Sequence, residues 1–197
     1  DYYQRPVFAT LLRWLRFLSF ILAVLVPPLF ISAVSYHQEL LPNPLLNNIS
    51  AQRHGVPLPV FIETIVMITI FEILREAGLR LPRIAGQAIS IVGALILGEA
   101  AVTAGIVSAI TVIVVAITAI SNFVAPSYCF GIAQRLLLFV YMCLAGVMGL
   151  YGLFCGVVFT IVHLASLKSF GVPYLAPIAP TFLSDWKDVL VRVPRPS

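Results

Sequence analysis

Residues 88–124 read AISIVGALILGEAAVTAGIVSAITVIVVAITAISNFV, and this stretch decides the fold. It carries one charged side chain, Glu99. As a single helix it would be about 55 Å long, whereas the hydrocarbon core of a bilayer is about 30 Å thick. We therefore expect two membrane helices, over 88–104 and 106–124. The break between them is expected near Thr103-Ala104-Gly105, because glycine ends a helix at little cost.

The rest of the chain has the same apolar character. Apolar residues make up 60% of its 197 residues and charged residues 10%, and the mean hydropathy is +1.03. Soluble domains carry about 25% charged residues, so this composition does not supply a water-facing surface. Residues 17–38 and 136–167 hold no Lys, Arg, Asp or Glu, and each is long enough for a membrane helix. The sequence predicts an all-α fold, a polytopic transmembrane helical bundle with kinked or broken helices.

The chain divides into three predicted parts. Residues 1–16 form a basic, aromatic lead-in suited to the membrane interface, and residues 168–197 form a Pro-rich segment with a short interfacial helix. Residues 17–167 form the transmembrane region, and Pro27 and Pro28 are expected to kink or break its first helix. The hydrophobic segments of this region are 17–36, 60–77, 88–104, 106–124 and 136–166.

Basic residues gather at the ends of the hydrophobic segments, as expected of cytoplasmic flanks. Both termini are then cytoplasmic, so the number of crossings is even. One of the five segments, 60–77 or 88–104, is accordingly expected to be re-entrant or interfacial. The same placement accounts for the net charge of +4 without nucleic-acid binding, since basic and aromatic residues do not interleave. Because the chain opens on Asp1, we expect it to be part of a longer protein.

A polar face runs along the predicted helix over 106–124. Its members recur at steps of three and four residues: Ser108, Thr111, Val115, Thr118 and Asn122. We call these five residues the Ser/Thr face. Such a face can pack against a neighbouring helix or bond to its own carbonyls, or it can line a pore in an oligomer. In the last case the five are pore-lining residues, and Val115 is a candidate hydrophobic gate.

The predicted helix that follows Pro59 carries charges among apolar residues. Glu72 and Glu76 share one face, with Arg75 beside them, and Glu63 lies opposite. A carboxylate inside a bilayer costs several kcal/mol unless it faces protein or water. Either these groups reach water at an interfacial end, or they form a buried polar network for assembly or gating. Glu99 is a further candidate member of that network.

The sequence contains no motif for covalent chemistry. It lacks a Gly-rich phosphate loop, an HExxH motif and a GxSxG motif, so we expect neither an enzyme nor a bound cofactor. The histidines and cysteines do not have the spacing of metal ligands, so no metal site is expected.

Five stretches of the sequence carry a family resemblance, in order and over almost the whole chain. They are DYYQRP (1–6), YHQELLPNPLL (36–46), FEILREAGLRLP (71–82), GQAISIVGALILGEAAVTAG (86–105) and LASLKSFGVPYLAPIAP (164–180). Together they resemble the GerA family, specifically the membrane region of the A subunit of spore germinant receptors. Glu99 stands where the family pattern has Gln, and Thr103 stands where it often has Glu, so the pattern of pore charge is not transferred.

The resemblance implies a soluble N-terminal domain outside this chain and a place in the bacterial inner membrane of the dormant spore. It implies two partners, a transporter-like B subunit that binds the nutrient and a lipoprotein C subunit. It also implies a homo-oligomer around a pore that conducts monovalent cations when nutrient binds. Three alternatives stay open: a non-conducting scaffold subunit, a SpoVAF-like paralogue associated with dipicolinate release, and a secondary transporter subunit. The absence of a repeated half disfavours the last.

Overall fold

The structure, a computed structural model, describes residues 6–80, 93, 96–124, 126–169 and 171–176. Its labelled elements are α1 (Pro6–Ser35), the 3-10 turn η1 (Gln38–Leu40), α2 (Asn43–Arg53), α3 (Val60–Arg80), α5 (Ala109–Phe123), α6 (Tyr128–Ser166), β1 (Lys168–Ser169) and β2 (Val172–Pro173). The two short strands pair antiparallel, and a further helical stretch covers 96–103. The described part of the chain is mostly helical, as predicted.

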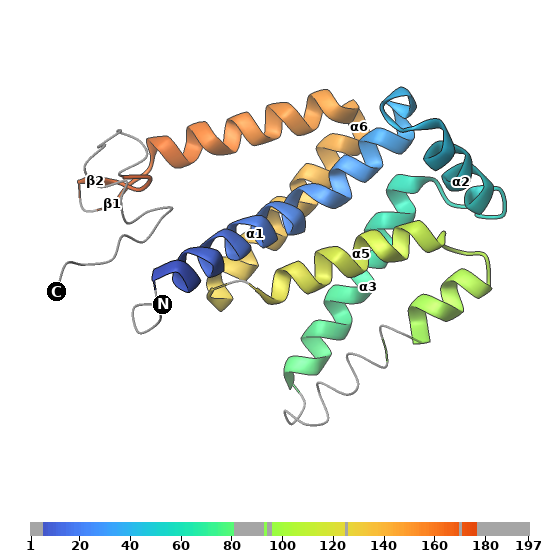
Figure 1. Ribbon diagram of the computed structural model, residues 1–197, viewed down its shortest axis with the longest axis horizontal. Helices are drawn as coiled ribbons and strands as arrows, with labels where there is room; N and C mark the ends of the chain where they lie inside the picture. Colours follow the sequence, from blue (N-terminus) through green and yellow to red (C-terminus); the bar gives the residue numbers. More distant parts are fainter. Residues whose placement is uncertain (1–5, 81–92, 94–95, 125, 170, 177–197) are drawn as a thin grey trace.

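α1 is the helix around which the others gather. It packs most extensively against α6 and α5, and it runs beside both in Figure 1. The Phe20 ring lies 5.4 Å from the Phe130 ring near the start of α6, and the Tyr36 hydroxyl donates to the Gly146 carbonyl at 2.5 Å. These contacts show that α1 and the first part of α6 run parallel. The shared core combines buried side chains from α1, α3, α5 and α6, among them Ile31, Ile68, Val115 and Met142.

Two prolines lie inside α1 without ending it. α1 continues through Pro27 and Pro28 to Ser35, so the alternative of a broken first helix is wrong. Both prolines are buried against neighbouring elements, which is the setting in which an apolar helix tolerates the lost hydrogen bonds. α1 also begins earlier than the first hydrophobic segment, at Pro6, a first-turn position that proline favours. Residues 6–16 of the predicted lead-in are therefore helical and continuous with the first segment.

α6 is a helical hairpin. Gly149 has φ 62° and ψ −142°, a conformation essentially restricted to glycine, and the helix folds back there (Figure 1). The Tyr141 hydroxyl donates to Thr160 Oγ1 at 2.8 Å, which joins the two arms. The hydrophobic segment 136–166, counted as one in the sequence, therefore belongs to two helical arms. Hydrophobic periodicity continues across the glycine, so the sequence pattern contains no sign of the reversal.

Small residues permit the two arms of α6 to touch. A Cβ atom added at Gly156 would lie 2.8 Å from Leu144 Cδ1, and one added at Gly152 would collide with the Leu144 carbonyl oxygen. Gly152 and Gly156 have the GxxxG spacing that favours close helix packing, and they lie where the two arms touch.

The helix break expected inside the opening stretch is present. The stretch 96–103 ends in a turn, Gly105 takes φ 68°, and α5 begins at Ala109. Residues 88–92, 94 and 95 lie outside the described residues, as does the interfacial helix expected within 168–197. The polar, Pro-rich stretch after α1 forms η1 and α2, with Pro42 immediately before α2 and Pro44 in its first turn.

Two helical stretches are long and apolar enough to cross a membrane, Pro6–Ser35 and Cys129–Ser166, among the described residues. α5 is apolar but shorter. Because Gly149 divides the second stretch, each arm of the hairpin approaches the length of about 20 residues that a crossing needs.

The hairpin depends on Gly149, and this can be tested with Gly149→Ala. A Cβ atom there would lie 3.0 Å from Tyr36 Cγ, and the positive φ strains any other residue. We expect the free energy of unfolding to fall by about 1–3 kcal/mol from the backbone alone. Thermal unfolding of the detergent-solubilised protein measures this. The control is Gly55→Ala, whose Cβ atom meets nothing within 4 Å. Equal stability of the two variants would contradict the assignment.

Candidate functional site

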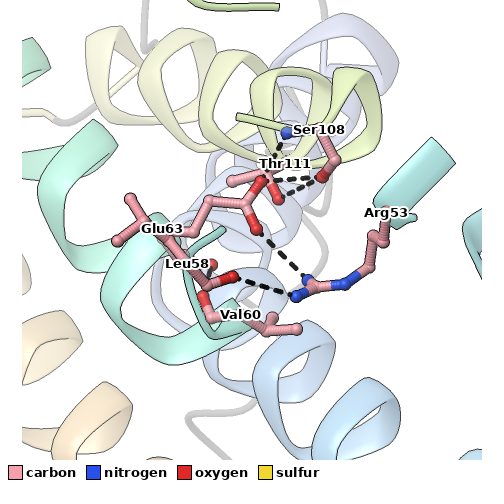
Figure 2. Close-up of polar contacts among 7 residues, drawn as sticks. Arg53, Leu58, Val60, Glu63, Ser108 and Thr111 are labelled. Carbon is pink, nitrogen blue, oxygen red and sulfur yellow. Dashed lines mark hydrogen bonds and ion pairs between the residues drawn. The ribbon is translucent and has the colours of Figure 1, made fainter. Parts of the chain in front are cut away.

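The most buried charge in the described part of the chain is the carboxylate of Glu63. It stands in the first turn of α3, directly after the Pro57–Pro59 stretch, and its exposed fraction is 0%. An acidic group in a first turn is favoured by the helix dipole. Complete burial, however, requires that its charge and its lone pairs be satisfied by protein groups. Figure 2 shows the groups that do so.

One carboxylate oxygen of Glu63 binds the start of α5. Glu63 Oε1 accepts from the backbone N–H of Ser108 at 2.6 Å and from the Ser108 hydroxyl at 2.8 Å. Ser108 is the N-cap residue of α5, yet its own side chain makes no capping bond. The carboxylate of α3 thus satisfies the N–H of the N-cap residue itself, one of the donors at the α5 terminus that have no partner within the helix. Because the Ser108 proton points to Glu63, the Thr111 hydroxyl donates to Ser108 Oγ, 2.9 Å away.

The other carboxylate oxygen binds α2. Arg53 Nη1 donates to Glu63 Oε2 at 3.2 Å, and Arg53 Nη2 donates to the Leu58 carbonyl at 3.3 Å. Arg53 lies in the last turn of α2. The four residues Arg53, Glu63, Ser108 and Thr111, which we call the Glu63 cluster, therefore join three helices at one point (Figure 2).

A second polar group, the Glu72 network, lies farther along α3. Glu72 pairs with Arg75 one turn on, at 3.4 Å, and with Arg135 of α6, at 3.1 Å. The Arg75 guanidinium also lies over the rings of Phe71 and Phe123, 5.4 and 5.6 Å from their centroids. The network thus ties α3 to the end of α5 and the start of α6.

Of the predicted network, Glu72 and Arg75 meet, as their spacing indicated, and the Glu76 side chain lies at the exposed surface of the same helix. Glu99 is also exposed, on the stretch 96–103, and among the described residues its carboxylate joins neither polar group. No role was predicted from the sequence for Arg135, which pairs with Glu72.

The Ser/Thr face lies inside the chain. All five of its residues are buried: Ser108, Thr111, Val115, Thr118 and Asn122. α5 turns this face toward the core formed with α1 and α3, while Ile113, Ile117 and Ile120 on its other side are exposed. The Thr118 hydroxyl donates to the Val114 carbonyl of its own helix at 2.8 Å. In this conformation the face packs, which was one of the two interpretations left open.

The sequence interpretation missed the central role of Glu63 and Arg53. Glu63 was placed on the face opposite Glu72, and no role was predicted for Arg53. A signal was present, since a lone carboxylate at the start of an apolar helix needs a cationic partner. The sequence does not show which cation pairs with Glu63. Arg53 is that cation because α2 turns it back toward α3 in the folded chain.

The arrangement supplies charge balance and hydrogen bonding where three helices meet. Within the described ranges no group of three or more His, Cys, Asp or Glu side chains is placed to hold a metal ion.

Replacing Glu63 distinguishes the contributions of its charge and its hydrogen bonds. Glu63→Ala leaves Arg53 and the Ser108 N–H without their acceptor, and we expect a loss of about 3–5 kcal/mol in the free energy of unfolding. Glu63→Gln keeps an acceptor for Ser108 and should cost less. Denaturant unfolding in detergent micelles gives both values. The exposed Glu39→Gln, expected to change stability by less than about 0.5 kcal/mol, is the control, and a Glu63→Ala variant as stable as this control would refute the cluster's role.

Comparison with known proteins places the chain in a family. The family described as Bacillus/Clostridium GerA spore germination protein matches residues 1–197. The chain is 50% identical to spore germination protein KA of Bacillus subtilis (strain 168), over 98% of the chain and 36% of that protein. It is 48% identical to spore germination protein GerLA of Bacillus cereus, over 99% of the chain and 40% of that protein.

A third relative is described as an uncharacterized membrane protein, YfkQ of Bacillus subtilis (strain 168), at 43% identity over 98% of the chain and 40% of that protein. The chain thus spans roughly two fifths of the length of these relatives, 36–40%. No solved structure matches it. Since the family match extends from the first residue to the last, the chain belongs to the GerA family of spore germination proteins.

Proposed function

We propose that this chain is the membrane region of a spore germinant receptor subunit. The family match over residues 1–197 is the observation that carries the proposal. Relatives at 50% and 48% identity are named as spore germination proteins, and they align with nearly the whole chain. The proposal places the chain in the inner membrane of the spore as a polytopic helical bundle.

The described helices fit that setting. α1 and α6 are long and apolar, and large apolar side chains such as Phe17, Ile120 and Phe159 are exposed along them and along α5. In a bilayer these apolar side chains would contact lipid chains, which is favourable, whereas in water they would remain exposed at a cost in free energy. The few charged groups of α3 that enter the interior are paired, as lipid surroundings require.

The proposed partners are the transporter-like B subunit, which would bind the nutrient, and the lipoprotein C subunit. Further copies of the chain are the third proposed partner. In this proposal a homo-oligomer surrounds a path for monovalent cations, and nutrient binding elsewhere in the receptor opens it. The chain itself then transmits the signal and does not recognise the nutrient.

The Ser/Thr face is the proposed lining of that path. Hydroxyls of Thr111 and Thr118 can replace part of a cation's hydration shell, and Val115 between them can close the path by excluding water. Because the face is buried against its own chain, the described conformation corresponds to the closed form. Opening then requires α5 to move away from α1 and α3.

A second candidate function is a non-conducting scaffold that holds the receptor together. The burial of the complete Ser/Thr face favours it, since packing alone accounts for these side chains. The Glu72–Arg135 pair, which links α3 to α6, would then serve assembly.

Val115→Thr distinguishes the two candidates. The two side chains have nearly the same shape, and the new hydroxyl can bond a carbonyl of its own helix. If Val115 is a hydrophobic gate, the hydroxyl weakens the exclusion of water, and lowering the barrier by about 1.4 kcal/mol raises the basal flux about tenfold. Cation release from dormant spores that carry the full-length protein, measured without nutrient, tests this.

The matched control is Val147→Thr, the same exchange at an exposed position of α6. Immunoblotting of spore membranes confirms that both variants accumulate. Release at the parent rate from both variants, at normal abundance, would favour the scaffold and reject the gate.

A further inference from the structure

The Glu63 cluster lies between an outer helix and the helix that bears the Ser/Thr face. We propose that Arg53, Glu63 and Ser108 form a latch that holds α5 closed, and that displacement of α2 releases it. The inference rests on the proposed function, because the movement that the latch controls is the proposed opening of α5. The observations that support it are the charge balance of Glu63, its bond to the α5 terminus and the backbone next to Gly105.

The first step is the dependence of Glu63 on Arg53. Glu63 is fully buried, and in the described structure Arg53 is the cation paired with it, while Ser108 supplies neutral donors. A buried carboxylate that loses its cation becomes strongly unfavourable. Removing Arg53 therefore drives Glu63 to move toward water or to take up a proton, and either change weakens its hold on Ser108.

The second step is that α2 is weakly held. Of its residues, all of which the structure describes, only Ile49 is buried, and Arg53 supplies the polar anchor. α2 lies at one end of the molecule and contributes a single side chain, Ile49, to the core (Figure 1). A partner that binds α2 can thus withdraw Arg53 at the cost of one buried apolar contact.

The third step is that Glu63 holds both the terminus and the face of α5. The Ser108 N–H is the terminal backbone donor bound by Glu63, and Ser108 and Thr111 are the first two residues of the Ser/Thr face. Loss of the carboxylate removes the acceptor at the α5 terminus and a buried contact of its polar face together. The same event that frees the helix therefore also frees the side chains that we propose for the path.

The fourth step is a place for α5 to turn. Residues 104–108 lie outside the helices, and Gly105 has φ 68°. The N–H groups of Gly105 and Ile106 donate to the Val102 and Ala101 carbonyls, both at 3.0 Å, and the Val107 N–H donates to Ala101 at 3.3 Å, so the turn that ends 96–103 extends to Val107. Rotation between Val107 and α5 leaves this turn and α5 each intact, as in hinge motions of other proteins. A Cβ atom at Gly105 would lie 3.9 Å from the Gly55 carbonyl oxygen, which places the α2–α3 connection beside the hinge.

The test measures access to the Ser/Thr face, not conduction. In full-length protein from which every cysteine has been removed, Cys129, Cys143 and Cys155 of this chain among them, Thr118→Cys introduces a thiol at a position 3% exposed. A small water-soluble maleimide then reports how often that thiol is exposed in native membranes. Adding Arg53→Met should raise the labelling rate about tenfold or more, a shift of about 1.4 kcal/mol in the opening equilibrium. Arg53→Lys, which keeps the charge, should stay near the parent rate, and His54→Ala, at the exposed C-cap of α2, is the control.

A second background tests the mechanism of the latch. Glu63→Gln keeps an acceptor for Ser108 and has no charge to balance, so adding Arg53→Met to it should change labelling less than twofold. If Arg53→Met alone labels at the parent rate, the latch is refuted. If the double variant labels as fast as Arg53→Met alone, charge balance is refuted as its basis. If Arg53→Met does not accumulate, Arg53→Gln replaces it in both backgrounds. The labelling rates of Arg53→Gln alone and of Arg53→Gln with Glu63→Gln are then read by the same two criteria.

Cation release from spores that carry the same variants separates this inference from the proposed function. Faster labelling with unchanged release supports the latch and contradicts conduction along the Ser/Thr face. Unchanged labelling with increased release contradicts the latch and leaves conduction supported.

Discussion

A carboxylate without access to water constrains the centre of this structure. Glu63 needs a cation for its charge and donors for its lone pairs, and the fold brings them from α2 and α5. Apolar helix surfaces tolerate small slides past each other, whereas a cluster of directed hydrogen bonds fixes one register. The meeting of three helices at Glu63 therefore gives α3 and α5 a defined relation that their aliphatic contacts alone would not specify.

The Glu72 network imposes a similar constraint at the other end of α3. Glu63 and Glu72 are separated along the helix by about 14 Å, and buried apolar side chains such as Met67 and Ile68 lie between them. Since Glu63 meets the start of α5 and Arg75 meets Phe123 at its end, the two helices run parallel and are held at both ends. Polar attachment at the ends and apolar packing between them let α3 carry charge inside an otherwise apolar assembly.

Much of the helical pattern was predictable because it depends on local chemistry. Gly105 ends a helix for reasons contained in its own backbone, and Glu72 and Arg75 meet because one helical turn separates them. The reversal at Gly149 was not predictable, since Gly146, Gly152 and Gly156 occur nearby and remain within helical arms. The packing of α5 was only half predictable, because periodicity identifies a polar face without identifying what covers it. The partners of Glu63 depend on long-range contacts, which a single sequence does not contain.

The reversal at Gly149 also decides where the two ends of the chain lie. α1 and the first arm of α6 run in one direction along the molecule, and the second arm returns, so the β1–β2 pair lies at the same end as the beginning of α1 (Figure 1). In the proposed membrane setting, both ends of the described chain then lie on one side of the bilayer. Segments attached to them share one aqueous space there, where they can contact each other and the same soluble factors.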